Sequence, residues 1–187
     1  MRSSRAANRQ RRRERGSQIV ELAVILPILL VFTAAAFDFG GVYTERDKIA
    51  NSAREGARIG SQQEFLQLAQ NGPGAAPTAD VKAIGQTVFA YLQNAKVVRG
   101  CTLSAGSNTG PFAWTFTANS CPDSLTIKVE RANPVLVNGT NALTTRVTVT
   151  YPAHFLLFHR VITLAAPGAN YANTFSIVAA ATMQNVP

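Results

Sequence analysis

An apolar segment near the N-terminus constrains this chain more than any other feature of its sequence. Residues 17–37 comprise 21 amino acids, of which Glu21 is the only charged one. About 20 apolar residues in a helix, rising 1.5 Å each, span the hydrocarbon core of a bilayer. The segment therefore predicts a transmembrane helix. Pro27 removes one hydrogen bond inside it and favours a bend, which a membrane helix tolerates where neighbouring helices cover the gap.

The distribution of charge predicts how this helix is oriented. The net charge is +8, but residues 1–16 contain seven arginines and one acid, which leaves +2 for the rest of the chain. Basic residues collect on the cytoplasmic side of membrane helices. We therefore expect the N-terminus inside and the chain beyond about residue 40 outside. A basic arm that binds nucleic acid is the alternative, and the adjacent apolar run favours the membrane interpretation over it.

A secretory signal peptide is a further interpretation of the same segment. The three alanines that end at Ala36 offer a small-residue cleavage site, and cleavage there would release a soluble protein that begins at Phe37. Against this, the apolar run is longer than a usual signal sequence, it contains an acid, and the helical pattern continues past Ala36.

Glu21 requires its own explanation, because a carboxylate in the apolar core costs a few kcal/mol. It can lie at the headgroups as an interfacial residue, by snorkelling or in the protonated form. A cation offers a second solution. If the chain is cut after Gly16, Ser17 carries a new α-amino group and Glu21 becomes the fifth residue. That amine can then pair with the carboxylate of a neighbouring helix, which favours polymerisation.

The basic leader, Gly16 and the stretch "SQIVELAVILP", together with "AREGAR" at residues 53–58, resemble the TadE-like family of tight-adherence (Flp-type) pilus systems. The resemblance covers about residues 12–60, with a weaker similarity in "TFSIVAAATMQ" near the C-terminus. It implies cleavage by a prepilin peptidase between Gly16 and Ser17, and a role of Glu21 in recognition and assembly. Ser17 departs from type IV pilins, which more often have an aromatic residue or Met there.

The chain after the membrane segment predicts a helical stalk over residues 44–70. Small residues recur on one face of this helix at Ala50, Ala53, Ala57 and Gly60. Small side chains allow close approach of backbones, so the stripe can contact a partner helix. A helix that lies on its own domain is the equal alternative. The predicted divisions are thus a leader at 1–16, a transmembrane helix at 17–43, the stalk at 44–70 and an outer domain at 71–187.

The outer domain is predicted to contain one helix and several strands. Residues 80–96 carry an apolar stripe at helical spacing, which Thr78 or Asp80 can cap. Alternating β-branched and aromatic residues predict strands at 97–103, 112–118, 124–131, 142–153 and 173–184. The expected fold is α+β with a mostly antiparallel sheet, a pilin-like layout. Residues 154–168 fit either a helical turn or an exposed apolar loop.

Few residues of this sequence are candidates for a disulfide, a metal site or a catalytic role. Cys101 and Cys121 are the only cysteines, and outside the cytoplasm we expect them to form a disulfide. Two histidines and unsuitable cysteine spacing give no metal site, and no catalytic or nucleotide-binding motif is present, so we expect neither an enzyme nor a cofactor.

The sequence therefore predicts a minor pilin or pseudopilin in the bacterial inner membrane. Its expected partners are other pilin subunits, the pilus assembly platform, prepilin peptidase and membrane lipid, with no nucleic acid. An unprocessed single-span envelope anchor or scaffolding protein is the alternative, and an exported soluble protein is the third hypothesis.

Overall fold

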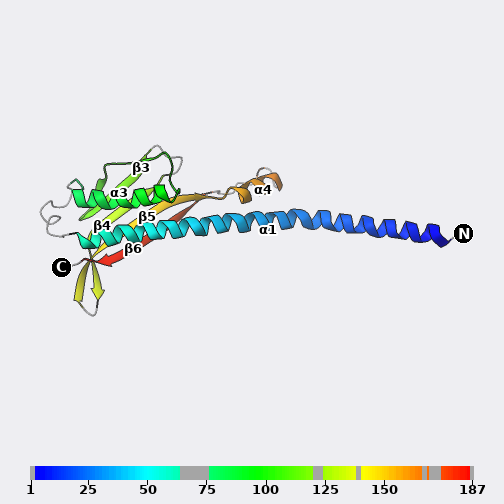
Figure 1. Cartoon of the computed structure of the whole chain (residues 1–187), viewed down its shortest axis with the longest axis horizontal. Helices are drawn as coiled ribbons and strands as arrows, with labels where there is room; N and C mark the ends of the chain where they lie inside the picture. Colours follow the sequence, from blue (N-terminus) through cyan, green and yellow to red (C-terminus); the bar gives the residue numbers. More distant parts are fainter. Residues whose placement is uncertain are drawn as a thin grey trace. The chain divides into compact units, whose positions relative to one another are not determined.

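The computed structural model describes residues 3–63, 76–119, 124–137, 140–165, 168 and 174–185, and the described side chains begin at Gln18 and exclude those of residues 137, 140 and 165. The chain divides into two compact units. One comprises Met1–Gly41 and Phe155–Asn173, and the other comprises Val42–His154 and Thr174–Pro187. The helix α1, Ser3–Gln62, contributes its first part to the first unit and its last part to the second (Figure 1). The predicted end of the stalk, at 64–70, lies outside the described residues.

The first unit consists of the apolar part of α1 and the short helix α4, Leu157–Ala165. Among the described residues, one helix is long and apolar enough to cross a membrane, Gln18–Gln62, and only 6% of its most apolar 18-residue window is buried. A buried core helix would have most of this window covered. For residues 154–168 the sequence left a helical turn and an exposed loop open, and the structure has a helix over Leu157–Ala165.

The second unit contains a six-stranded antiparallel sheet, with the order β1-β3-β4-β5-β6 and with β2 paired to β3. The strands are β1 (Thr102–Leu103), β2 (Ser107–Gly110), β3 (Ala113–Asn119), β4 (Thr126–Val137), β5 (Thr140–His154) and β6 (Thr174–Gln184). A long N-terminal helix followed by an antiparallel sheet confirms the predicted α+β, pilin-like layout.

The two faces of this sheet differ in the way that strand periodicity requires. Phe116, Ile127 and Val149 lie side by side on neighbouring strands, and all three are buried. The residues that follow two of them along the strands, Thr117 and Thr150, point to the opposite face and are exposed or half-buried. Because successive side chains alternate between faces, one side of the sheet is apolar and the other is rich in threonine.

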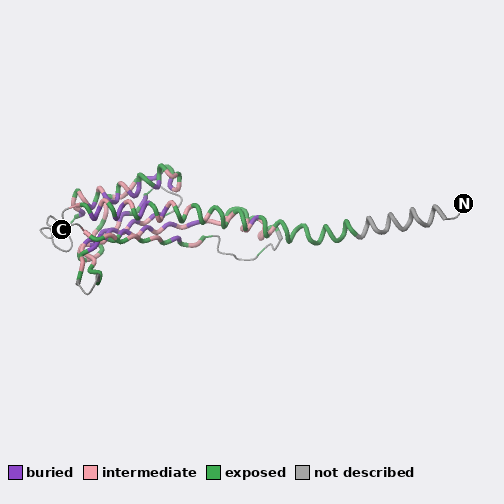
Figure 2. Tube along the Cα trace, turned by 60° about the horizontal axis from the view of Figure 1, so that its bottom comes forward, coloured by how far each residue is buried: buried purple, intermediate pink, exposed green. Residues whose placement is uncertain are grey.

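Two helices cover the apolar face: the last part of α1, and α3, Ala79–Asn94 (Figure 1). Gly85 of α3 lies against the ring of Phe116 on β3, where an added Cβ would come within 3.0 Å of the ring. Trp114, the only tryptophan of the chain, is 1% exposed in the same core. The buried residues of the tube in Figure 2 therefore belong mostly to this unit.

The helix α3 begins where the sequence indicates. Thr78 is its N-cap and its hydroxyl accepts a hydrogen bond from the backbone N–H of Val81 at 3.5 Å, which satisfies one of the donors that a helix start leaves free. The predicted apolar stripe is buried at Val81, Ile84, Val88 and Leu92, so this face of the helix is part of the core. Ala95 is the C-cap and is half-buried.

The strand prediction for residues 97–103 is largely wrong. Only Thr102–Leu103 is a strand there, and residues 97–101 are irregular, with left-handed φ values of 59° at Lys96, directly before them, and 67° at Gly100. Such left-handed conformations interrupt a strand. The structure also adds β2, Ser107–Gly110, which has no strong alternating pattern and pairs with β3.

Candidate assembly interface

The apolar part of α1 exposes large side chains over several helical turns. Ile19 is 67% exposed, Leu29 is 62% exposed and Phe32 is 72% exposed. This surface is green in Figure 2, from residue 18 to residue 30 without interruption. Contiguous apolar patches of this kind on a protein mark a membrane or a protein interface, since exposure to water is unfavourable for each side chain.

Glu21 is exposed on this apolar surface. Of the side chains that the structure describes, which begin at Gln18, none forms an ion pair with its carboxylate. Gly16 and Ser17 lie within α1, but their side chains and those of the arginines before them are outside the described set. Cleavage between Gly16 and Ser17, and charge pairing by Glu21, therefore remain predictions.

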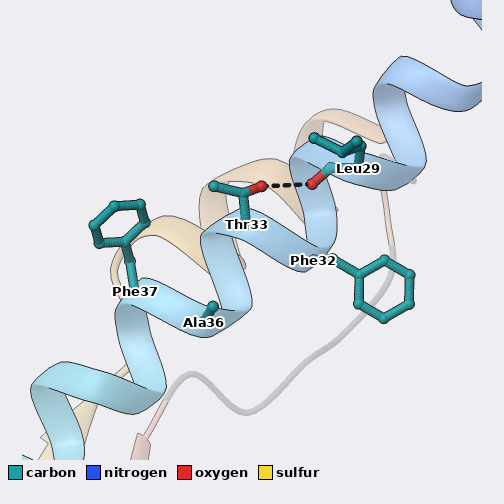
Figure 3. Close-up of a pocket in the computed structure, with 5 residues that line it drawn as sticks. All are labelled: Leu29, Phe32, Thr33, Ala36 and Phe37. Atoms are coloured by element: carbon teal, nitrogen blue, oxygen red, sulfur yellow. Dashed lines mark hydrogen bonds between the residues drawn. The ribbon is translucent and has the colours of Figure 1, made fainter.

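A shallow groove runs along the same part of α1. Leu29, Phe32, Thr33, Ala36 and Phe37 line it, and the two phenylalanine rings point to different sides of the helix (Figure 3). The hydroxyl of Thr33 donates a hydrogen bond to the carbonyl oxygen of Leu29 at 2.8 Å. This internal bond satisfies the one polar side chain of the groove, so the groove is suited to an apolar neighbour.

Pro27 lies within α1, which is assigned as one helix from Ser3 to Gln62. The proline has no N–H to donate to the carbonyl one turn before it. A neighbouring helix or a polar side chain from another molecule can satisfy such a carbonyl in a membrane. Whether Pro27 contributes to helix packing between subunits remains a prediction.

The stripe of small residues lies against the domain of its own chain. Ala53 and Ala57 are fully buried and Gly60 is buried, whereas Ala50 is half-buried. An added Cβ at Gly60 would lie 2.6 Å from Cγ2 of Thr145 on β5. Of the two alternatives that the sequence left open, the described contacts are those of a helix that packs on its own sheet.

Gly56, in the centre of "AREGAR", makes the closest approach. An added Cβ there would clash with Cγ2 of Val88 on α3 and would lie 3.4 Å from Cγ1 of Val147 on β5. Glycine in a helix costs about 1 kcal/mol relative to alanine. The contact with both α3 and β5 explains why the helix contains glycine at this position.

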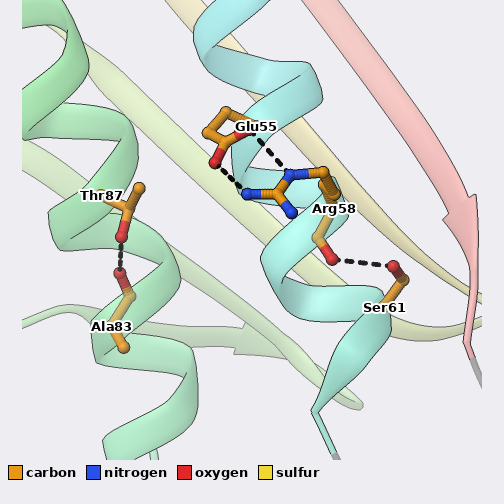
Figure 4. A network of polar contacts seen from close by, with 5 residues as sticks. All are labelled: Glu55, Arg58, Ser61, Ala83 and Thr87. Atoms are coloured by element: carbon orange, nitrogen blue, oxygen red, sulfur yellow. Dashed lines mark hydrogen bonds and ion pairs between the residues drawn. The ribbon is translucent and has the colours of Figure 1, made fainter.

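The charged residues of the same motif face outward. Arg58 donates from Nε to Oε2 of Glu55 at 2.9 Å and from Nη2 to Oε1 at 2.6 Å, a two-point ion pair within one helical turn (Figure 4). The hydrogen bond from Arg58 lowers the pKa of Glu55, and the same bond raises the pKa of Arg58. The hydroxyl of Ser61 donates to the carbonyl oxygen of Arg58 at 2.8 Å, one turn further on.

Sequence reasoning missed Asp38. Its carboxylate accepts hydrogen bonds from the backbone N–H groups of Leu157 at 3.2 Å and Phe158 at 2.7 Å, and thus caps the start of α4. The rings of Phe39 and Phe155 meet edge to face beside it, with centroids 5.5 Å apart. In the sequence, Asp38 is an acid directly after an apolar run. No local pattern predicts that its hydrogen-bond partners lie about 120 positions further along the chain.

Sequence reasoning also missed Arg131, which is 2% exposed. It lies in a bulge of β4, directly before Ala132, whose φ is 59°, and its Nη2 donates to the carbonyl oxygen of Gln63 at 3.0 Å. Burial lowers the pKa of this guanidinium. A cation at the carboxyl end of α1 complements the helix dipole and fixes that end to the sheet.

The cysteines and possible metal ligands are the remaining residues with potential chemistry. Cys101 is buried and takes part in a disulfide. Cys121, its predicted partner, lies outside the described residues, so this pairing remains a prediction. Within the described part of the chain, no three His, Cys, Asp or Glu residues are grouped so as to hold a metal ion.

An exposed apolar helix joined to an antiparallel-sheet domain is the layout of a membrane-anchored, pilin-like protein. The family model described as "TadE-like protein" matches residues 16–58 of the 187, so the chain carries a TadE-like segment that extends from Gly16 to Arg58. This match relates the chain to Tad pilus systems and, with the apolar helix, supports membrane anchoring. Comparisons with curated proteins and with solved structures gave no match.

Proposed function

We propose that the protein is a minor pilin or pseudopilin of a tight-adherence pilus. The observation that carries this proposal is the surface of α1 over residues 18–37, which is mostly apolar and largely exposed, with Glu21 as its only charged residue. A lipid bilayer satisfies the apolar side chains but not an isolated carboxylate. A helix of this composition therefore favours a membrane, and a cationic neighbour would stabilise the charged form of Glu21 there.

The neighbour is a second subunit that a prepilin peptidase has cut between Gly16 and Ser17. The cut exposes the α-amino group of Ser17, one helical turn before Glu21. When two such helices pack with an offset of about one turn, the amine of one meets the carboxylate of the other. The match of the family model from residue 16 onward supports this use of the segment.

The work of such a subunit is assembly and not chemistry on a small molecule. The N-terminus lies in the cytoplasm before cleavage, and the sheet domain lies outside. The domain packs the small-residue stripe of α1 against itself, which leaves the apolar part of the helix as the surface available for lipid and for other pilin subunits.

Replacement of Glu21 by alanine tests the proposal. The Glu21→Ala chain is expected to insert into the membrane as the natural chain does, because an apolar helix with one acid fewer is more favourable in lipid. It is expected to be lost from purified pili and from complexes with pilus components. Quantitative mass spectrometry of both fractions, from cells that make the chain, measures the two effects.

Gln18→Ala is the matched control, since Gln18 is an exposed polar residue less than one turn from Glu21. This variant is expected to assemble normally. Normal recovery of Glu21→Ala with pilus components would refute the charge-pairing mechanism, and equal losses for both variants would show that any change at this end of the helix prevents assembly.

A further inference from the structure

The helix α4 carries an apolar surface that the described residues leave uncovered. Leu156, directly before the helix, is 69% exposed, Leu157 is 48% exposed and Leu164 is 86% exposed. Leu157, Arg160 and Leu164 follow one another at i, i+3 and i+7, so they share one side of the helix. This side therefore combines two exposed leucines with one exposed cation.

The start of α4 is fixed to α1 at Asp38. The carboxylate of Asp38 accepts hydrogen bonds from the backbone N–H groups of Leu157 and Phe158. Phe155 packs edge to face with Phe39 of α1 and with Phe158 of α4, at centroid distances of 5.5 and 6.2 Å. Both the polar and the aromatic contacts join the same two short segments, so the position of α4 along α1 is defined.

That position is the end of the apolar span. Asp38 is the first charged residue after residues 22–37, which are uncharged and largely exposed. Residues 18–37 form about 30 Å of helix at 1.5 Å per residue, the thickness of a hydrocarbon core. When this span lies in a bilayer, Asp38 lies at the boundary between acyl chains and headgroups, and so does the start of α4.

We propose that α4 binds the surface of the bilayer at this boundary. Leu156, Leu157 and Leu164 enter the outer part of the acyl region, and Arg160 meets the phosphates of the headgroups. Short helices with aliphatic side chains and a basic residue bind membranes in this manner, because long basic side chains extend from an apolar surface to the headgroup layer. The ligand is thus a lipid surface, preferably an anionic one.

The exposed Arg160 favours lipid over a second helix as the partner that binds this side of α4. Surfaces at which membrane helices pack are rich in small residues, which bring backbones close together. The exposed side of α4 has leucines around an arginine and no small residue among the three. Such a side is complementary to the surface of a lipid bilayer, in which acyl chains and phosphates lie at adjacent depths.

A fluorescent label at position 164 tests the proposal in the full chain. The Leu164→Cys variant is labelled with the fluorophore NBD without reductant, so that the native disulfide stays closed, and is reconstituted in vesicles of phosphatidylcholine and phosphatidylglycerol. We expect blue-shifted emission and quenching by nitroxide-labelled lipids several-fold stronger than for a label at Gln86→Cys, an exposed position of α3. Asp38→Ala should reduce the quenching at position 164, whereas Asp47→Ala, an exposed acid of α1, should not.

Three outcomes would overturn the proposal. Emission at position 164 that matches the label at position 86 would show that α4 lies in water. A protected label without lipid quenching, accompanied by crosslinks from position 164 to a second copy, would assign this surface to another protein. Failure of the whole chain to sediment with the vesicles would overturn both this inference and the membrane anchoring on which it depends, whereas sedimentation without quenching overturns this inference alone.

Discussion

The two parts of α1 belong to one continuous helix but differ in the size and the burial of their side chains. Over residues 18–37 the side chains are large, apolar and exposed, whereas over residues 49–61 the buried face is built mainly from alanine, glycine and serine. The large side chains of the first part present an extensive apolar surface to whatever surrounds the helix. Small ones let the second part approach α3 and β5 closely, as Gly56 and Gly60 show.

Small residues in a membrane-proximal helix therefore do not by themselves indicate contact between subunits. In this chain the stripe of Ala53, Ala57 and Gly60 packs on the sheet of the same molecule. The surface left for other molecules is the one with bulky side chains. Variants that exchange the properties of the two parts therefore test the distinction.

The largest expected effect concerns the exposed part. The double variant Leu26→Asp and Leu29→Asp places two acids in the apolar span, at a cost of about 3 kcal/mol each for insertion. We expect most of the chain to move from the carbonate-resistant membrane fraction to the soluble or aggregated fractions, as measured by immunoblotting. Asn51→Asp, an added acid at an exposed position of the second part, should leave the membrane fraction unchanged. Equal membrane fractions for the two variants would contradict insertion of residues 18–37.

An intermediate effect is expected from glycine substitutions. Gly56→Ala should destabilise the domain by about 2 kcal/mol, because the overpacking against Val88 exceeds the gain of about 1 kcal/mol in helix propensity. In Gly40→Ala, the new Cβ has no atom within 4 Å, so this variant should be at least as stable as the natural chain. Denaturant unfolding of the detergent-solubilised chain, followed by the fluorescence of the single buried Trp114, measures both. A stable Gly56→Ala would refute the close packing.

The smallest effect is expected at the ion pair of Glu55 and Arg58. Because the folded chain lowers the pKa of Glu55, the pair stabilises the fold above the unfolded-state pKa of about 4.3, and this contribution disappears as the pH falls through the folded-state value. Glu55→Gln should therefore be slightly less stable than the natural chain at pH 7 and equal to it in acid. Since both side chains are partly exposed, salt should also reduce the difference. A difference that persists in acid would exclude the ion pair as its cause.

Local patterns were sufficient to predict some elements of this fold and not others. The apolar run, the cap at Thr78 and the alternation around Phe116 and Val149 each report a local periodicity, and the structure has a helix or strand at each of these places. The direction in which the small stripe faces depends on which surface is complementary to it, and sequence spacing does not contain that information.

The contacts of Asp38 and Arg131 were unpredictable for a related reason. Each joins segments far apart in the chain: Asp38 with the start of α4, and Arg131 with the carboxyl end of α1 at Gln63. Ile127, Val129 and Arg131 are buried at every second position of β4, so strand alternation places Arg131 inward, but this pattern does not show that its guanidinium meets Gln63.

The mature N-terminus tests the central claim most directly. Mass spectrometry of the terminal peptide, from protein extracted from membranes of cells with an active prepilin peptidase, is expected to show a chain that begins at Ser17. That result would give Glu21 of a neighbouring subunit the α-amino partner that the assembly mechanism requires. A chain that begins at Met1, or at Phe37 after signal-peptide cleavage, would contradict the mechanism, because the partner would be missing in the first case and Glu21 itself in the second.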